Sequence, residues 1–241
     1  YRNLVDQPQV GSDLRAMAQY QVVRARYQMG DFAQVVDEVA SLRRQFPGSG
    51  YELDAIYDQG WAEFYTERYD DAIATFAELL GLTIDPLIRD RAIFQTGESH
   101  FALARYERAR AEYRRLVGLY DFATMSDKQL KEMKTERLRG LVQETTRELV
   151  AKAQIRIGDA YGQENRLDEA VAAYSLVPQR YPEETLLVQR SFENMAALLQ
   201  QAQGADAGIA VLRRAIEQTP DDQFRGRAQF RIATTLYAEG R

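Results

Sequence analysis

The sequence predicts an all-helical solenoid, built from antiparallel helix hairpins and interrupted by one inserted helix. Small residues return along the chain in two parallel series. The first series is Gly60, Gly97, Gly158, Ala196 and Ala233, at steps of 37, 61, 38 and 37 residues. The second is Ala72, Ala109, Ala170 and Gly208, and each of these follows a member of the first at the same offset. Two small residues per period, one on each of two helices, are typical of a helix-hairpin solenoid.

The composition excludes several classes of protein. The chain has 241 residues, 45% of them hydrophobic, and no run approaches the roughly 18 apolar residues of a membrane span. It contains no Cys, which excludes disulfides, thiolate catalysis and Cys-ligated metals. A net charge of −5 argues against nucleic acid as the main partner.

The hairpin at residues 52–86 shows the local signals that define each repeat. Gly60 and Phe64 are four residues apart, so they share one face of a helix. Asp70 follows a short turn and places negative charge where a helix N-terminus favours it. Pro86 is expected to close the second helix, because the residue before a proline disfavours helical geometry.

The same signals divide the whole chain, which we interpret as a single solenoid over residues 1–241. The predicted repeats are 14–47, 52–86, 88–120, 147–182 and 185–220, with a half-repeat at 223–241. Residues 1–10 match the end of a preceding repeat, so both ends look cut and the chain reads as a fragment of a longer protein. A capping helix at the C-terminus is the alternative.

One insertion, at residues 121–146, breaks the period. Ser126 and Gln129 have the spacing of a capping box, which predicts an extra helix here. Insertions in repeat proteins often lie on a binding face. The alternative is a helix that only packs against the edge of the solenoid, and the sequence leaves both open.

The small-residue pairs, the aromatic residues and the closing prolines together resemble the tetratricopeptide repeat family. The aromatic residues are Phe32, Tyr69 and Tyr106 in the turns and Phe76, Tyr113 and Tyr174 on the second helices. The resemblance implies a right-handed superhelix. The long period and the closure Phe46-Pro47-Gly48-Ser49 look like the bacterial cell-envelope branch, such as periplasmic Tol–Pal-associated proteins and outer-membrane assembly lipoproteins. This likeness implies the periplasm or cell envelope, with the cytoplasm as the alternative.

Residues for chemistry are scarce. The chain has no phosphate loop, dinucleotide fingerprint or zinc-protease motif. Its one histidine, His100, is read as a packing or surface residue rather than a base or ligand. We therefore expect no enzyme, no catalytic residues, no metal site and no cofactor. The arginines between Arg105 and Arg115 are expected on a solvated outer face.

The resemblance implies that the first helix of each hairpin lines a concave groove. Trp61, the only tryptophan, is expected to anchor a peptide there. The alternative is that the aromatic residues form core between adjacent hairpins. The candidate ligand-binding residues are Tyr20, Arg24, Tyr57, Asp58, Trp61, Phe94, Glu98, Lys152, Arg156 and Asp159.

These observations favour a non-enzymatic scaffold that binds a peptide or helical segment of a protein partner, in a bacterial cell-envelope complex. The alternative is a spacer or sensor arm of a larger enzyme or regulator whose active domain lies outside this chain. Mixed charges on the candidate groove disfavour a nucleic-acid partner. The sequence sets neither the identity of the partner nor the oligomeric state.

The repeat makes a direct prediction about stability. Replacing Gly97 by Leu should lower the free energy of unfolding by on the order of 1–3 kcal/mol, because the added side chain overpacks the helix crossing. Thermal unfolding measures this, and an unchanged melting temperature would count against the hairpin interpretation.

Overall fold

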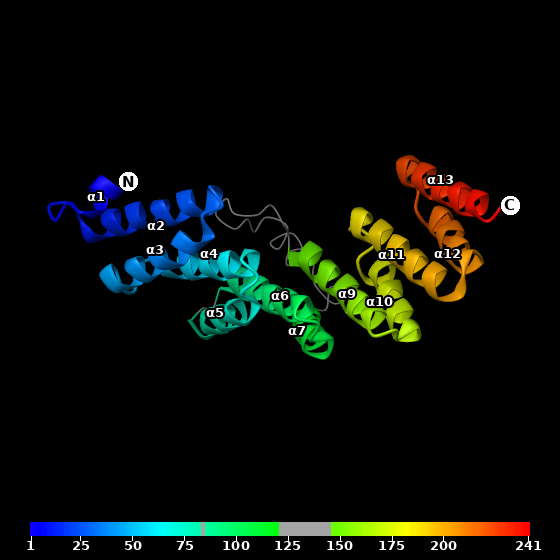
Figure 1. Cartoon of the computed structure of the whole chain (residues 1–241), viewed down its shortest axis with the longest axis horizontal. Helices are drawn as coiled ribbons and strands as arrows, with labels where there is room; N and C mark the ends of the chain where they lie inside the picture. Colours follow the sequence, from blue (N-terminus) through cyan, green and yellow to red (C-terminus); the bar gives the residue numbers. More distant parts are fainter. Residues whose placement is uncertain (83–84, 121–145) are drawn as a thin grey trace. The chain divides into compact units, whose positions relative to one another are not determined.

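The computed structural model of the chain describes residues 1–82, 85–120 and 146–241, and these form helices and turns without a strand. They divide into two compact units, Tyr1–Arg105 and Tyr106–Arg241. Figure 1 shows the helices in chain order. The insertion expected at residues 121–146 lies outside the described residues, except for Thr146, which begins α9.

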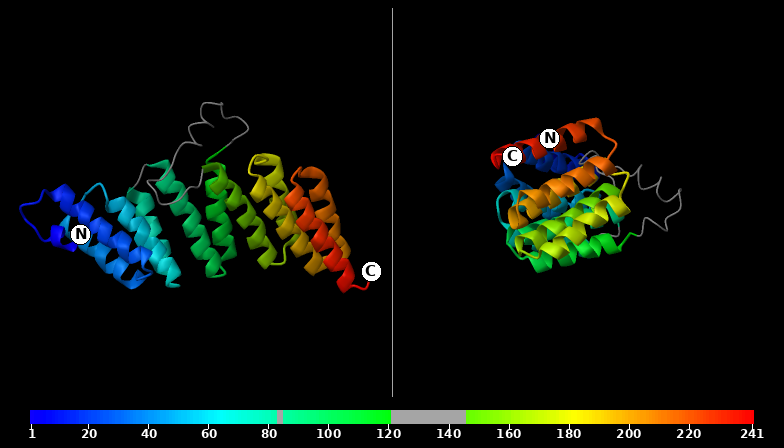
Figure 2. Two further views of the ribbon diagram at one scale, coloured as in Figure 1. Left: turned by 90° about the horizontal axis from the view of Figure 1, so that it is seen from above. Right: turned by 90° about the vertical axis from the view of Figure 1, so that its right-hand side faces the viewer.

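The described residues of the first unit form six helices, and each longer helix packs against the next in the chain. The first helices of successive hairpins also touch, α2 against α4 and α4 against α6. Helices that are consecutive in the chain run antiparallel, as the two views of Figure 2 show. The bounds are α1 Arg2–Val5, α2 Ser12–Gln28, α3 Phe32–Gln45, α4 Glu52–Tyr65, α5 Tyr69–Leu82 and α6 Pro86–Ala102.

The second unit contains another six described helices. Here α9 packs on both α7 and α10, and the chain continues through α11 and α12 to α13. The first helices α9 and α11 also touch each other. The bounds are α7 Tyr106–Gly118, α9 Thr146–Gln163, α10 Leu167–Arg180, α11 Thr185–Gln203, α12 Ala205–Gln218 and α13 Asp222–Ala238.

Four hairpin turns share one backbone conformation. Their left-handed residues are Gly30, Glu67, Ala104 and Asn165, with φ of 74°, 61°, 55° and 57°. In each turn the next amide donates to the carbonyl five residues before it, as Arg68 N does to Glu63 O at 2.9 Å. This hydrogen bond is that of a Schellman helix end. Glycine and asparagine tolerate this conformation, whereas Glu67 and Ala104 adopt one that L-residues rarely adopt.

Two glycines of the first helices lie under aromatic rings of the second helices. A Cβ atom at Gly60 would be 2.6 Å from Cε1 of Phe76, and one at Gly158 would be 2.6 Å from Cε1 of Tyr174. A side chain at either glycine would clash with the ring, so only glycine fits. Each ring lies one helical turn after the small residue of the second helix, Ala72 or Ala170. In the first hairpin Val23 replaces the glycine and Val39 replaces the ring, so volume is exchanged between the two helices.

The fifth hairpin exchanges its two small residues. A Cβ atom at Gly208 on α12 would lie 2.8 Å from the carbonyl oxygen of Ala196 on α11. The backbones of α11 and α12 thus approach closely at this point. The turn is also shorter, because Gly204 alone separates the two helices, at φ 94°.

The expectation that Pro86 closes the second helix of its hairpin is wrong. Pro86 is the first residue of α6. The side chain of Asp85 accepts a hydrogen bond from Leu87 N at 2.9 Å, and Pro86 occupies the first turn of the helix. Proline suits this position because the first amides of a helix have no partner within the helix. Proline disfavours helical geometry in the residue before it, and here that residue is Asp85, the extended N-cap of α6.

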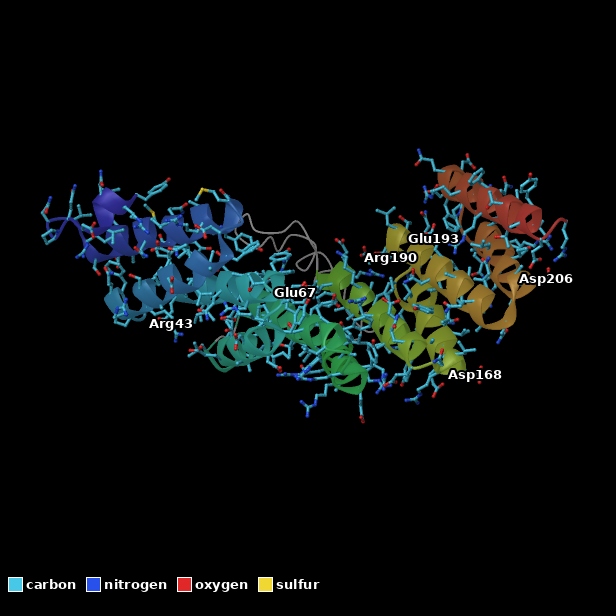
Figure 3. The ribbon with its side chains drawn as sticks, in the orientation of Figure 1. Arg43, Glu67, Asp168, Arg190, Glu193 and Asp206 are labelled. Carbon is cyan, nitrogen blue, oxygen red and sulfur yellow. The ribbon has the colours of Figure 1, made fainter. Side chains whose placement is uncertain are left out.

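Ion pairs join neighbouring hairpins within each unit. In the first unit Arg43, labelled in Figure 3, pairs with Glu52 at 3.2 Å and with Glu78 at 2.6 Å. In the second unit Arg241 pairs with Asp206, also labelled there, at 2.7 Å. These side chains are in contact with solvent, so we assign the stability of the hairpins mainly to buried packing.

The contact between Gly158 and Tyr174 predicts a position-specific cost for one methyl group. Gly158→Ala should lower the free energy of unfolding by about 1–3 kcal/mol, since the ring of Tyr174 is held in place by its hydrogen bond to Asp159. The control is Gly226→Ala on α13, where a Cβ atom meets nothing within 4 Å. Gly226→Ala should instead stabilise by roughly 0.5–1 kcal/mol. Urea unfolding followed by circular dichroism compares them, and equal effects would contradict the proposed packing.

Candidate functional site

The first unit brings seven aromatic and charged residues together on two neighbouring first helices. We call this surface the α2–α4 face. On α2 the members are three or four residues apart. On α4 three of them are four residues apart, and Asp58 lies three residues before Trp61, so each set shares one side of its helix. The residues are Tyr20, Arg24 and Tyr27 on α2 and Tyr57, Asp58, Trp61 and Tyr65 on α4.

The charged pair of the α2–α4 face joins a buried carboxyl group to a partly exposed arginine at long distance. Asp58 is 1% exposed, and its Oδ2 lies 3.8 Å from Nε of Arg24. Arg24 Nη1 donates to the hydroxyl of Tyr20 at 3.5 Å. Burial raises the pKa of Asp58 to about 7, although the nearby Arg24 and Tyr20 act in the opposite direction. Asp58 is therefore a carboxyl group that changes charge near neutral pH.

The aromatic residues of this face form a ladder that joins the first two hairpins. Tyr65 stacks on Trp61 with ring centroids 5.3 Å apart, and on Phe32 at 5.2 Å. Tyr27 meets Tyr65 at 6.3 Å, and Tyr57 meets Trp61 edge-on at 6.4 Å. Tyr57 is buried, Trp61 is half-buried and Tyr65 is 52% exposed. The ladder is thus anchored in the core and reaches the surface at Tyr65.

Two further predicted residues lie on the next first helix of the same unit. Phe94 and Glu98 are one turn apart on α6, and both are half-buried. Because α6 packs on α4, the structure places seven of the ten candidate residues on three successive first helices of one unit.

The remaining three candidates lie on α9 in the second unit. Lys152 pairs with Glu148 at 3.2 Å, and Arg156 pairs with Asp159 at 3.2 Å. Asp159 also accepts hydrogen bonds from the hydroxyl of Tyr174 at 2.7 Å and from Asn194 Nδ2 at 3.0 Å. Three donors from three helices converge on this carboxylate, so it joins the first helices α9 and α11 to the second helix α10.

The expectation that the arginines near residue 110 lie on a solvated outer face is wrong for Arg110. This residue is 4% exposed and pairs with Glu164 at 2.5 Å. Its guanidinium also lies 4.4 Å from the ring centroid of Tyr161. A carboxylate and an aromatic face together compensate for the loss of water, which the charge pattern alone did not reveal.

Sequence reasoning missed Tyr27, Phe32 and Tyr65 as parts of the site. A signal for two of them was present, because Tyr27 is three residues after Arg24 and Tyr65 is four after Trp61. Phe32 was assigned only to the hairpin turn. Its contact with Tyr65 depends on how two hairpins pack, so it has no local sequence signal.

Within residues 1–82, 85–120 and 146–241, no group of three or more acidic or histidine side chains is placed to hold a metal ion. No helix in this part of the chain combines the length and the apolar character needed to cross a membrane.

Comparison with known proteins addresses the family and the fold. Models of the tetratricopeptide repeat match residues 57–124 and 152–184. A search of curated proteins finds no match.

Several solved structures resemble the chain. MamA from residue 41 onward, from Desulfovibrio magneticus RS-1, has a TM-score of 0.56 at 13% identity and covers 84% of this chain and 94% of its own. YrrB, described as a tetratricopeptide repeat protein with an unusual peptide-binding site, has a TM-score of 0.51 at 15% identity, with coverage of 89% and 91%. The apo form of RapI has a TM-score of 0.63 at 8% identity, with coverage of 84% and 69%.

These matches support the tetratricopeptide repeat family and confirm the all-helical solenoid fold that the sequence predicts.

The pKa of Asp58 predicts an unusual dependence of stability on pH. Its folded pKa of about 7 lies above the ordinary value of 3.8, so the folded state binds the proton more tightly than the unfolded state. Stability should therefore fall as pH rises from about 4 to 7, by at most about 4 kcal/mol at 1.4 kcal/mol per pKa unit.

Asp58→Asn should flatten this dependence and be more stable than the wild type at pH 8. The control is Asp37→Asn at an exposed position of α3, which should preserve the pH dependence. Urea unfolding at pH 4, 6 and 8 measures the effect. A wild-type stability that rises across this range with no effect of Asp58→Asn would contradict the assignment.

Proposed function

We propose that this protein is a non-enzymatic scaffold whose α2–α4 face binds a peptide or helical segment of a protein partner. The observation that carries the proposal is the aromatic ladder, in which Tyr65 is half-exposed and stacked on Trp61. Trp, Tyr and Arg are the residues most enriched at the energetic centres of protein interfaces.

Rigidity supports the same proposal. Trp61 and Tyr65 are held by stacked and edge-on contacts to rings of both hairpins, so little side-chain freedom remains to be lost on binding. Arg24 lies one turn before Tyr27 on the same face and supplies a partly exposed cation. YrrB, a protein of the same fold, is described as having a peptide-binding site.

We further propose that the partner belongs to a bacterial cell-envelope complex, which the long period and the Phe46-Pro47-Gly48-Ser49 closure support. The competing function is a spacer or sensor arm of a larger enzyme or regulator. Fractionation of cells that express this protein tests the envelope proposal. Recovery in the periplasmic or membrane fraction is expected, and recovery only in the cytoplasmic fraction would overturn it.

Trp61 provides a direct test, because it is the only tryptophan in the chain. Peptides from a random phage-displayed library are selected on the purified protein and then titrated while the tryptophan emission is recorded. Peptides that bind the α2–α4 face should shift or quench this emission. Tyr65→Ala should weaken their binding by at least about tenfold, as expected for a residue at the centre of an interface.

The matched control is Tyr237→Ala on α13, where a tyrosine of the second unit is 86% exposed. It should leave the affinity unchanged. Peptides that bind without any change in tryptophan emission, and equally well to the Tyr65→Ala protein, would show that the α2–α4 face is not the binding site.

A further inference from the structure

A pocket of the second unit lies outside every site described above. It has a volume of about 410 Å³ and lies among α7, α9 and α10, the green and yellow-green helices of Figure 1. Its apolar lining comes from Val117, Ile157, Ala172, Ala173 and Leu176. The two adjacent alanines of α10 leave the space that larger side chains would fill. A volume of this size is within the range of ligand pockets.

The charges around the pocket are positive and only partly compensated. Tyr161 lines the pocket, and the guanidinium groups of Arg110 and Arg166 lie 4.4 and 4.7 Å from its ring centroid. These two arginines have carboxylate partners, Glu164 at 2.5 Å and Glu169 at 2.5 Å. Their charges are therefore balanced within the unit.

Two other arginines in the pocket lining are not balanced. Arg114 donates to the hydroxyl of Tyr161, and its guanidinium is 5.5 Å from the same ring. Within the described part of the chain, neither Arg114 nor Arg180 forms an ion pair with a carboxylate. Both side chains are exposed, so they are available to an anionic ligand. An apolar lining bordered by two uncompensated guanidinium groups is complementary to a ligand with apolar and acidic parts.

The positions of the two arginines indicate the kind of ligand. Arg114 is held against Tyr161, and Glu169 pairs with Arg166 against the same ring, whereas Arg180 is the last residue of α10. At 1.5 Å per residue, about 16 Å of helix separate Glu169 from Arg180. A ligand with one carboxylate would pair with one arginine and leave the other uncompensated. A peptide with several acidic residues can pair with both.

We propose that this pocket is a second protein-binding site, which takes an acidic peptide segment of a partner. An apolar side chain of the segment occupies the space over Ala172 and Ala173, and its flanking carboxylates pair with Arg114 and Arg180. The site lies among α7, α9 and α10 of the second unit, whereas the α2–α4 face belongs to the first, so the site does not depend on that face.

The test is a subtractive peptide selection on the complete 241-residue chain. A random phage-displayed dodecapeptide library is selected on the wild-type protein after depletion on Ala172→Trp, a variant in which an exposed alanine of the pocket is replaced by a residue that fills it. The recovered peptides should combine acidic with apolar residues. Fluorescein-labelled copies should bind the wild type, and the affinity should fall as salt is added.

Point variants connect the binding to the two arginines. Arg114→Gln and Arg180→Gln should each weaken binding by at least about tenfold, since each removes one charge-assisted hydrogen bond. Arg213→Gln removes the same charge from an exposed position on α12 and should have no effect. Ala172→Glu is the second pocket variant, which places a carboxylate beside the arginines and should also prevent binding. Circular dichroism establishes that each variant is folded.

Three outcomes would overturn the proposal. In the first, the selection recovers no peptide whose binding depends on the pocket. In the second, the recovered peptides lack acidic residues and bind the arginine variants as tightly as the wild type. In the third, dodecanoate displaces the peptides, and its binding requires Arg114 but not Arg180. The last result would assign the pocket to a single-carboxylate amphiphile. Because Trp61 is in the other unit, its emission separates failure here from failure of the α2–α4 face.

Discussion

The rest of the structure depends on the close packing of an aromatic ring of the second helix against a residue without a side chain on the first helix. At Gly60 and Gly158 even a methyl group would lie 2.6 Å from the ring of Phe76 or Tyr174. The contact allows only one register between the two helices, because a shift by one residue would place a Cβ atom in the ring. Interiors packed at crystal-like density do not absorb such a change.

Packing within each hairpin, which in the first hairpin uses Val23 and Val39 in place of a glycine and a ring, determines which side of the first helix faces the next first helix. On α2 and α4 it places Tyr20, Arg24 and Tyr27 beside Asp58 and Tyr65, so two stripes from different hairpins form one surface. Arg24 meets Asp58 at 3.8 Å, and Tyr27 meets Tyr65 at 6.3 Å between ring centroids. The α2–α4 face therefore forms only when two hairpins pack together, because each helix contributes only part of it.

Two carboxylates of the first helices, Asp58 and Asp159, have contrasting environments. Asp58 has one distant cation and little exposure, and its pKa rises to about 7 because burial outweighs that attraction. Asp159 instead accepts from Arg156, Tyr174 and Asn194, all within 3.2 Å. The first arrangement leaves a carboxyl group that responds to pH, whereas the second joins three helices. Position on a first helix therefore did not by itself predict the role of an acidic residue.

The sequence by itself determined the helical hairpins, their period and the faces of the first helices. These follow from the spacing of residues along the chain. Gly60 and Gly97 show the period, and Tyr57, Trp61 and Tyr65, four residues apart, mark one face of a single helix. Only the tertiary structure decided the rest. Glu67 and Ala104 adopt left-handed turns, Pro86 begins a helix instead of ending one, and Arg110 is buried against Tyr161. The left-handed turns and the start of α6 are stabilised by hydrogen bonds at the helix ends themselves, whereas the burial of Arg110 depends on Tyr161 of another helix. In each case the contact outweighs the local preference of the residue.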